Sequence, residues 1–537
     1  MCTIVYNRLM NINLYSWQTE CLRIWKKNHC RGCVDVVTGA GKTVLALAAT
    51  SDLKQAYPAL HVFILVPTVA LATQWKKAIL HALPRGFFNR IGQFGGGRYD
   101  HKGCDCIIYV INSAREALPK HMIEDLRDGH PGFLIADEYH RYASPQNIRV
   151  FSFLADPHFR SSMYWSLGLS ATSLSKPYTP ALGDVIFSYP ISAALRDGVV
   201  SPFILYGISV HFSGEELSRY ADVTEALGLI YKQLSDAYPE LKAIQLTSNS
   251  RLDSFLAIRR IAAEENDPDG LPARYLKLIY QRNIITRTAG SRIRCVLSLL
   301  QRSDPSRKVI FFCERIDQST ELFQALNALF PGQVSHYHSG LSKEFRKTSL
   351  DLFRLGETRL LVTCKALDEG IDVPDASIGI VVSATGVRRQ RIQRLGRILR
   401  KAQGKRLAVL YYLYVHESNE DSNYLIGDNG GAPVFFLNYL DRDDTFLFPE
   451  YEKAAVKTAD FLVHGMRLSR KDPRMRELLR CLDLGITRPD WLLPVADLEE
   501  YLQHSESIHE RNYWICMKHV AKSFNGENSR ITLTGQH

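Results

Sequence analysis

Long apolar runs and a cysteine pattern typical of a disulfide framework are both missing from this chain of 537 residues. No apolar stretch approaches the roughly 18 residues that a membrane-spanning helix needs. The most apolar stretch, residues 62–70, is short and contains Pro67. The opening residues 1–14 have polar interruptions and no small-residue cleavage site, so we expect no secretory signal. Because the 11 cysteines are scattered, they indicate reduced thiols. Together with the lack of long apolar runs, they predict a cytoplasmic protein that does not enter membranes.

The sequence also lacks internal repeats, low-complexity tracts and a strong excess of one charge. Lys and Arg number 66 against 56 Asp and Glu, which gives a net charge of +10. This mild basic excess is compatible with a polyanionic partner, but many enzymes without such a partner carry a similar one. The close pairs Cys30/Cys33 and Cys104/Cys106 lack the four spaced ligands of a zinc site, and Cys33 begins an apolar run. An ordinary strand is therefore favoured there over a metal site.

Short apolar runs alternate with helix-like segments in two parts of the chain. The first set of runs comprises residues 34–37, 62–66, 107–111, 133–136 and 165–169, and the second comprises residues 309–313, 360–363, 378–382 and 407–413. Continuous apolar strands between helices are typical of a parallel sheet that is covered on both faces. The sequence therefore predicts an α/β protein with one lobe at residues 1–205 and a second at residues 301–420.

The remaining parts of the chain have a different pattern. Residues 206–300 are predicted to be a helical connecting segment, because apolar residues recur there at three- and four-residue spacing. Residues 421–537 are predicted to be a mostly helical C-terminal appendage of unknown role. Its segments at 491–494 and 512–516 are rich in Trp and aliphatic residues, and form either a small core or a docking face for a partner.

A glycine-rich turn follows the first apolar run, in residues 34–43 (VDVVTGAGKT). Gly39 and Gly41 permit the backbone to direct its N–H groups inward, around phosphate oxygens. We expect Lys42 to reach the β- and γ-phosphates of ATP and Thr43 to coordinate Mg²⁺. Val36 stands where the full P-loop pattern has its first glycine, so the turn alone is only moderately specific. The predicted phosphate cradle consists of Thr38, Gly39, Ala40, Gly41, Lys42 and Thr43.

Two acids follow another apolar run, in residues 133–140 (FLIADEYH). We expect Asp137 to hold Mg²⁺ and Glu138 to orient or deprotonate the attacking water. A lone Asp-Glu pair is also common at the start of a solvated helix. Its combination with Lys42 and Thr43 favours a nucleotide-hydrolysing site.

Residues 137–140, Asp-Glu-Tyr-His, resemble motif II of the DEAH-type helicases of superfamily 2. The other motifs of that family follow in order, at residues 14–18, 66–75, 110–113, 170–172, 309–313, 336–340, 362–374 and 393–400. The resemblance covers roughly residues 13–415. It implies two tandem RecA-like lobes that clamp ATP between them and move along nucleic acid as they open and close.

The resemblance also implies roles for individual residues. It places Gln18 and Tyr15 on the adenine, and Gly370 and Asp372 of motif V at the nucleotide. It implies that Arg397 and Arg400 of motif VI are arginine fingers, and that Gln393 of the same motif bridges the lobes. Coupling of hydrolysis to movement is assigned to His140, Ser170 and Thr172, and contacts with the track are assigned to Thr68, Ser113, Gly340 and Thr363.

The sequences of motifs Ia and V resemble those of the DNA-acting branch of the family, which includes excision-repair, type III restriction and phage recombination motors. We therefore expect DNA rather than RNA as the partner, in repair, recombination or phage defence. Two alternatives stay open: a sensor or clamp that uses ATP without unwinding, and the motor subunit of a defence complex. Because no nuclease constellation stands out in the sequence, a nuclease or repair subunit would be a separate chain that binds the C-terminal appendage.

Overall fold

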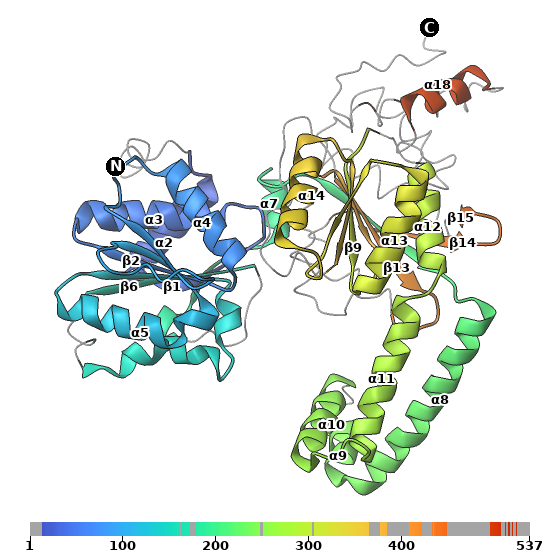
Figure 1. Ribbon diagram of the computed structural model, residues 1–537, viewed down its shortest axis with the longest axis horizontal. Helices are drawn as coiled ribbons and strands as arrows, with labels where there is room; N and C mark the ends of the chain where they lie inside the picture. The colour runs from blue at the N-terminus through green and yellow to red at the C-terminus, as the bar shows by residue number, and fades with distance from the viewer. Residues whose placement is uncertain are drawn as a thin grey trace.

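The computed structural model forms two β-sheets, each flanked by helices, and a helical hairpin that extends from the second sheet (Figure 1). It describes residues 13–157, 159, 163–171, 179–247, 251–302, 306–364, 376–383, 408–420, 432, 434–447 and 494–505, together with residues 511, 514, 515, 518 and 522. Among these residues, no helix is both long enough and apolar enough to cross a bilayer.

The first sheet has seven strands in the order β3-β4-β2-β5-β6-β1-β7, and every paired strand is parallel to its neighbour. Its strands are β1 (Arg31–Val36), β2 (His61–Val66), β3 (Ile91–Phe94), β4 (Cys106–Val110), β5 (Gly132–Asp137), β6 (Tyr164–Ser170) and β7 (Val185–Tyr189). The helices around it are α2 (Ser16–Lys27), α3 (Lys42–Ala56), α4 (Val69–Ala82), α5 (Ile111–Arg127), α6 (Thr179–Leu182) and α7 (Ile191–Arg196), with 3₁₀ helices at Tyr139–Tyr142 and Asn147–Ala155.

Helices cover both faces of the first sheet, which explains why its strands are apolar without alternation. Helices α2, α3 and α4 bury one face, and α5 lies on the other (Figure 1). The central strands β1, β2 and β5 are almost entirely buried. Loops that leave the carboxyl ends of β1 and β5 therefore meet at one edge of the sheet, where ligands of open α/β sheets bind.

The second sheet has eight strands in the order β10-β11-β9-β12-β13-β8-β14-β15, with only the β14–β15 pair antiparallel. Its strands are β8 (Phe203–Val210), β9 (Val309–Cys313), β10 (Val334–Tyr337), β11 (Leu360–Cys364), β12 (Ile378–Val381), β13 (Ala408–Val415), β14 (Val434–Leu440) and β15 (Thr445–Leu447). Its helices are α12 (Ser291–Gln301), α13 (Ile316–Leu329) and α14 (Lys343–Leu355). The predicted pair of α/β lobes with parallel sheets is confirmed.

Two features of the second sheet were not expected from the sequence. Strand β8 pairs with β13 over its whole length, so the division drawn after residue 205 falls inside a strand of the second sheet. Strands β14 and β15 come from the region expected to be a mostly helical appendage, and they extend the sheet beyond β8. From the same region, Leu498 of α18 (Val495–Gln503) is buried in the core of the second lobe.

The helical hairpin lies between β8 and α12 in the chain. It consists of α8 (Gly214–Ala237), α9 (Pro239–Thr247), α10 (Arg251–Glu265) and α11 (Leu271–Arg287). Helices α8 and α11 run side by side away from the second sheet, with α9 and α10 at the far end (Figure 1). The far end has its own small core, which includes Leu234, Leu241 and Ile258. Helix α8 starts at a capping box, in which Ser213 and Glu216 each accept a backbone N–H of the other.

Candidate functional site

The glycine-rich turn joins β1 to the first residue of α3, as the sequence predicted. Gly39 and Gly41 have φ angles of 90° and 99°, in the left-handed region where a side chain is unfavourable. A Cβ on Gly41 would also lie 2.9 Å from the Nε2 atom of Gln18. The first N–H groups of α3 have no partner within the helix, and they point toward its positive end. This geometry forms an anion site that suits phosphate oxygens.

The acid pair stands at the end of β5. Asp137 is the last residue of the strand, and Glu138 follows it with a φ angle of 52°. The Lys42 Nζ atom lies 3.5 Å from the Glu138 Oε1 atom, and both side chains are largely buried. The structure therefore brings together the lysine and the acid that the sequence assigned to phosphate binding and to water activation.

Asp137 is held by donors that the sequence analysis did not identify. The indole Nε1 of Trp75 donates to its Oδ2 atom at 2.8 Å, and its own backbone carbonyl accepts from the Tyr142 hydroxyl at 2.6 Å. Trp75 is 1% exposed. The available signal was its place in the segment that resembles motif Ia, which follows β2, the neighbour of β5.

Burial and the surrounding charges give the two acids opposite pKa shifts. Burial, together with the adjacent Glu138 carboxylate, raises the pKa of Asp137 to about 6. Burial also disfavours the charged form of Glu138, but the cations Lys42, His140 and Arg141 hold the pKa of Glu138 below its usual value. Glu138 is therefore a carboxylate at neutral pH, as a water-orienting base must be.

His140 links the acid pair to the end of the neighbouring strand β6. Its Nδ1 atom lies 2.9 Å from the Ser170 hydroxyl and 3.4 Å from the Glu138 Oε2 atom. The contact joins two of the three residues predicted to couple hydrolysis to movement. The third, Thr172, lies outside the described residues.

Gln18 contacts the phosphate turn directly. Its Nε2 atom donates to the Gly41 carbonyl at 2.9 Å, and its Oε1 atom accepts from the Tyr15 backbone N–H at 2.8 Å. The amide that was expected to read adenine thus also fixes the turn. Tyr15 is 45% exposed, and the adenine contact of both residues stays a prediction.

The predicted track contacts fall at strand ends of the two sheets. Thr68 caps α4 by accepting the Leu71 N–H at 3.3 Å, and Ser113 lies in the first turn of α5. These residues follow β2 and β4, which are neighbours in the first sheet. Gly340 follows β10 in the second sheet, whereas the Thr363 hydroxyl donates to the Phe311 carbonyl at 2.7 Å and joins β11 to β9. No ligand tests these four contacts.

The second-lobe residues assigned to the nucleotide cannot be placed. Gly370, Asp372, Gln393, Arg397 and Arg400 lie outside the part of the chain that the structure describes. Their roles stay predictions.

The first-lobe residues fit a nucleoside triphosphate. The Thr38 Oγ1 atom is buried without a hydrogen-bond partner among the described residues, and the buried Lys42 Nζ atom has only the 3.5 Å ion pair with Glu138. A buried donor without an acceptor is costly, and phosphate oxygens at this turn would satisfy both. No group of three or more His, Cys, Asp or Glu side chains in the described ranges could hold a metal ion.

Two family models match this chain, one on each lobe. Residues 11–174 match the model described as type III restriction enzyme, res subunit, and residues 291–402 match the helicase conserved C-terminal domain. The chain is a superfamily 2 helicase. Its two sheets are the two RecA-like lobes of that superfamily, and the helicase is an ATP hydrolase.

Similar proteins agree with this assignment. The helicase is 29% identical over 404 residues to the DNA 3′-5′ translocase XPB2 of Sulfurisphaera tokodaii, covering 74% of this chain and 81% of the relative. It is 26% identical over 402 residues to the DNA 3′-5′ helicase XPB of Mycobacterium tuberculosis, covering 73% of this chain but only 59% of that relative. A solved structure of the DUF1998 helicase MrfA bound to DNA shares the fold, with a TM-score of 0.50 and 13% identity over 93% of this chain and 61% of the other.

Proposed function

We propose that this helicase uses ATP hydrolysis to move along DNA in the 3′-to-5′ direction. One observation carries the proposal: contacts run without a break from Lys42 through Glu138 and His140 to Ser170. A change at the nucleotide would therefore reach the end of β6 through three successive contacts. The similar proteins support the track and the direction, because both are named for 3′-to-5′ action on DNA.

Each residue of the first lobe has a distinct part in this proposal. Lys42 and the N–H groups of the turn bind the phosphates, and Glu138 holds the attacking water and accepts its proton. Thr43 and Asp137 would hold Mg²⁺. A magnesium ion usually takes one or two carboxylates and completes its shell with substrate phosphates and water. When bound, it would neutralise charge on the phosphates.

The second lobe would complete the site when the lobes close. Arg397 and Arg400 are proposed to stabilise the charge that develops on the γ-phosphate, and Gln393 to bridge the lobes. An arginine supplied in this way is worth about 10³–10⁵ in rate in related hydrolases. DNA bound across both lobes would favour closure, so it would stimulate hydrolysis.

The protein partner predicted for the C-terminal appendage, and a role in repair, recombination or phage defence, remain proposals. Trp514 and Ile515, from the segment predicted to form either a small core or a docking face, pack against the core of the second lobe. Their packing favours the core interpretation for this segment. Co-purification of the full chain with a nuclease or repair subunit would support the partner.

Strand displacement and triplex displacement on defined DNA test the proposal. We expect ATP-dependent removal of a third strand from duplex DNA, and displacement from substrates with a 3′ overhang but not a 5′ overhang. Glu138→Gln protein is the control without hydrolysis. Hydrolysis stimulated by DNA without either form of displacement would favour a clamp or sensor instead. Displacement on RNA alone would contradict the DNA assignment.

A further inference from the structure

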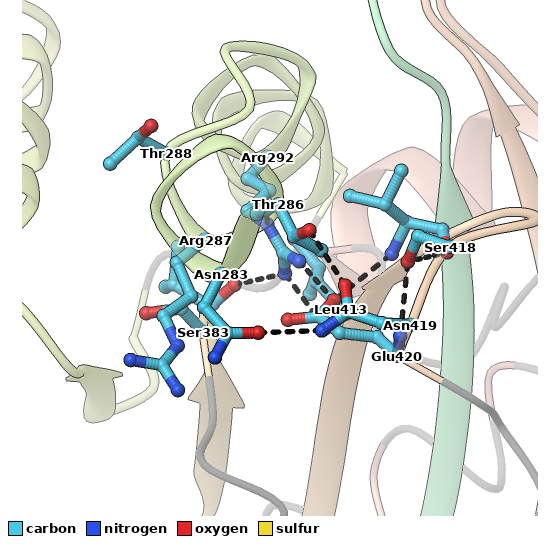
Figure 2. A network of polar contacts seen from close by, with 12 residues as sticks. Asn283, Thr286, Arg287, Thr288, Arg292, Ser383, Leu413, Ser418, Asn419 and Glu420 are labelled. Carbon is cyan, nitrogen blue, oxygen red and sulfur yellow. Dashed lines mark hydrogen bonds and ion pairs between the residues drawn. The ribbon is translucent and has the colours of Figure 1, made fainter. Parts of the chain in front are cut away.

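A buried arginine connects the helical hairpin to the second sheet. Arg292, the second residue of α12, has no exposed surface. Burying an arginine is unfavourable unless its donors and its charge are matched. Figure 2 shows how the match is made, by groups from three separate parts of the chain. None of these residues belongs to the helicase motifs described above.

The contacts of Arg292 join two strand ends to one helix end. Its Nη1 atom donates to the carbonyls of Val382 at 2.6 Å and Leu413 at 2.9 Å, at the carboxyl ends of β12 and β13. Its Nε atom donates to the Thr286 carbonyl at 3.0 Å, in the last turn of α11. That carbonyl has no partner further along the helix, so Arg292 caps α11. The guanidinium also forms an ion pair with Glu420.

Residues 418–420 make further contacts between the second sheet and the hairpin. Asn419 accepts from the Thr286 hydroxyl at 2.8 Å, donates from its side chain to Asn283 at 2.6 Å, and donates its backbone N–H to the Tyr220 hydroxyl at 2.7 Å. Tyr220 belongs to α8, whereas Asn283 and Thr286 belong to α11. The short segment after β13 therefore holds both long helices of the hairpin at their base. Figure 2 shows Asn419 beside Asn283 and Thr286 of α11.

The exit of β12 is fixed by neighbouring contacts. The Ser383 hydroxyl donates to the Gln318 side chain at 2.5 Å and accepts from the Glu314 N–H at 3.1 Å. Gln318 in turn donates to the Arg287 carbonyl at 2.5 Å, at the end of α11. The orientation of the hairpin and the direction in which the chain leaves β12 are thus set by one set of polar contacts.

The hairpin is long enough for a movement of its far end to be transmitted to the contacts around Arg292. Helix α8 has 24 residues, which corresponds to about 36 Å at 1.5 Å per residue. A small rotation of the hairpin displaces its far end several times farther than its base. Conversely, a force applied to the far end would act on the contacts around Arg292.

We propose that Arg292 is a positioning residue, which with Glu420 and Thr286 keeps the hairpin and the carboxyl ends of β12 and β13 in one geometry. The proposal rests on the proposed function, because the motif VI arginines lie between β12 and β13 in the chain. It acts through the position of the strand ends and does not require Arg292 to touch ATP or DNA. DNA-stimulated hydrolysis, which needs closed lobes, should depend on it more than the basal rate does.

The ratio of ATP hydrolysis rates with and without saturating single-stranded DNA tests this proposal in the full chain. The ratio is independent of the active fraction, so a purely structural loss would not change it. We expect Arg292→Lys, which keeps the charge but not the forked donors, to lower the ratio about threefold to tenfold. Thr286→Val, which removes the hydroxyl contacts to Asn419 and to the Arg282 carbonyl within α11, should lower it about twofold.

Arg302→Gln is the matched control. It removes an ion pair with Asp444 at the other end of α12, away from the hairpin. We expect an unchanged ratio. Hydrogen exchange should be faster in the last turn of α11 in both test variants. If Arg292→Lys does not fold, the ratio measured with Thr286→Val tests the proposal. An unchanged ratio despite faster exchange would overturn the positioning role, whereas a ratio of one in the wild type would first overturn the proposed function.

Discussion

Lys42 and Glu138 lie 3.5 Å apart, from Nζ to Oε1, although they follow different strands of the first sheet. The lysine is expected to bind phosphate and the glutamate to activate water. An incoming triphosphate would compete with Glu138 for the lysine, because its oxygens carry more charge. Binding of ATP would then free the carboxylate to hold a water molecule.

Substitution of each residue of this pair should have a different effect. We expect Lys42→Ala to weaken ATP binding and to lower hydrolysis at least about 100-fold, because the phosphates lose their cation. Glu138→Gln should keep ATP binding and lower kcat about 10²- to 10⁴-fold, since only the base is lost. Titration with a fluorescent ATP analogue and steady-state hydrolysis separate these outcomes. Equal loss of binding in both variants would contradict the division of roles.

The raised pKa of Asp137 predicts that stability depends on pH. The folded-state value of about 6 exceeds the usual 3.8, so the folded protein binds this proton more tightly than the unfolded chain does. The stabilising contribution is complete below about 3.8 and is lost as pH rises through about 6. Asp137→Asn should therefore be more stable than the wild type at pH 7.5, by about 3 kcal/mol, and this advantage should shrink toward pH 5. Thermal unfolding without nucleotide measures it.

Asp137→Asn should at the same time abolish Mg²⁺-dependent hydrolysis, since an amide is a poor ligand for the ion. A variant that is less stable than the wild type at every pH would contradict the assigned cause, and would indicate that the Trp75 hydrogen bond outweighs the burial of the charge.

Trp75 should matter for metal binding beyond its packing. Trp75→Phe keeps an aromatic ring but removes the N–H that orients Asp137. We expect the Mg²⁺ concentration for half-maximal hydrolysis to rise about tenfold, as when other second-sphere donors are removed. Trp25→Phe is the control, because its buried Nε1 donates to the Ser166 carbonyl at 2.9 Å, at a position unrelated to the acids. A similar loss of stability without a change in Mg²⁺ dependence is expected there.

Ser170→Ala tests the coupling contact with His140. The substitution removes the hydroxyl contact with His140 and no group assigned to phosphate binding or water activation, so basal hydrolysis should stay within about twofold of the wild type. Displacement of DNA per ATP hydrolysed should fall by several-fold, because the link from Glu138 to the end of β6 is broken. Loss of hydrolysis and displacement in the same proportion would indicate that His140 and Ser170 serve the chemistry alone.

Gly41 is predicted to be irreplaceable for nucleotide binding. Alanine there would be strained at a φ angle of 99° and would contact Gln18 at 2.9 Å. Gly41→Ala should therefore lose measurable ATP binding. Gly129 has a φ angle of 83° but open space around it, so Gly129→Ala carries a similar backbone cost of about 1–2 kcal/mol without the clash. If both variants bind ATP equally well, the turn is not the phosphate site.

Much of the nucleotide site could be predicted from sequence because its residues lie in short segments. The pattern in residues 34–43 and the acids after a buried strand each describe one side of the site. Parallel strands meet at one edge of a sheet, so the two sides were expected to face each other, and the distance between Lys42 and Glu138 agrees. The contacts of Trp75 and Gln18 could not be predicted, because they depend on how helices pack over that edge.

The boundary of the second lobe was harder to predict for a related reason. Strand β8 pairs with β13, about 200 residues later in the chain, and no local pattern shows which of two sheets a strand joins. Arg292 illustrates the same limit. Its periodicity places it on an ordinary helix, and only the fold brings Val382, Leu413 and Glu420 around it.

The rate of ATP hydrolysis by the full chain, with and without single-stranded DNA, tests the central claim most directly. We predict a basal rate that DNA raises at least about tenfold, with both rates lost in Glu138→Gln. A rate that DNA leaves unchanged, or that persists in Glu138→Gln, would contradict a DNA motor driven from this site.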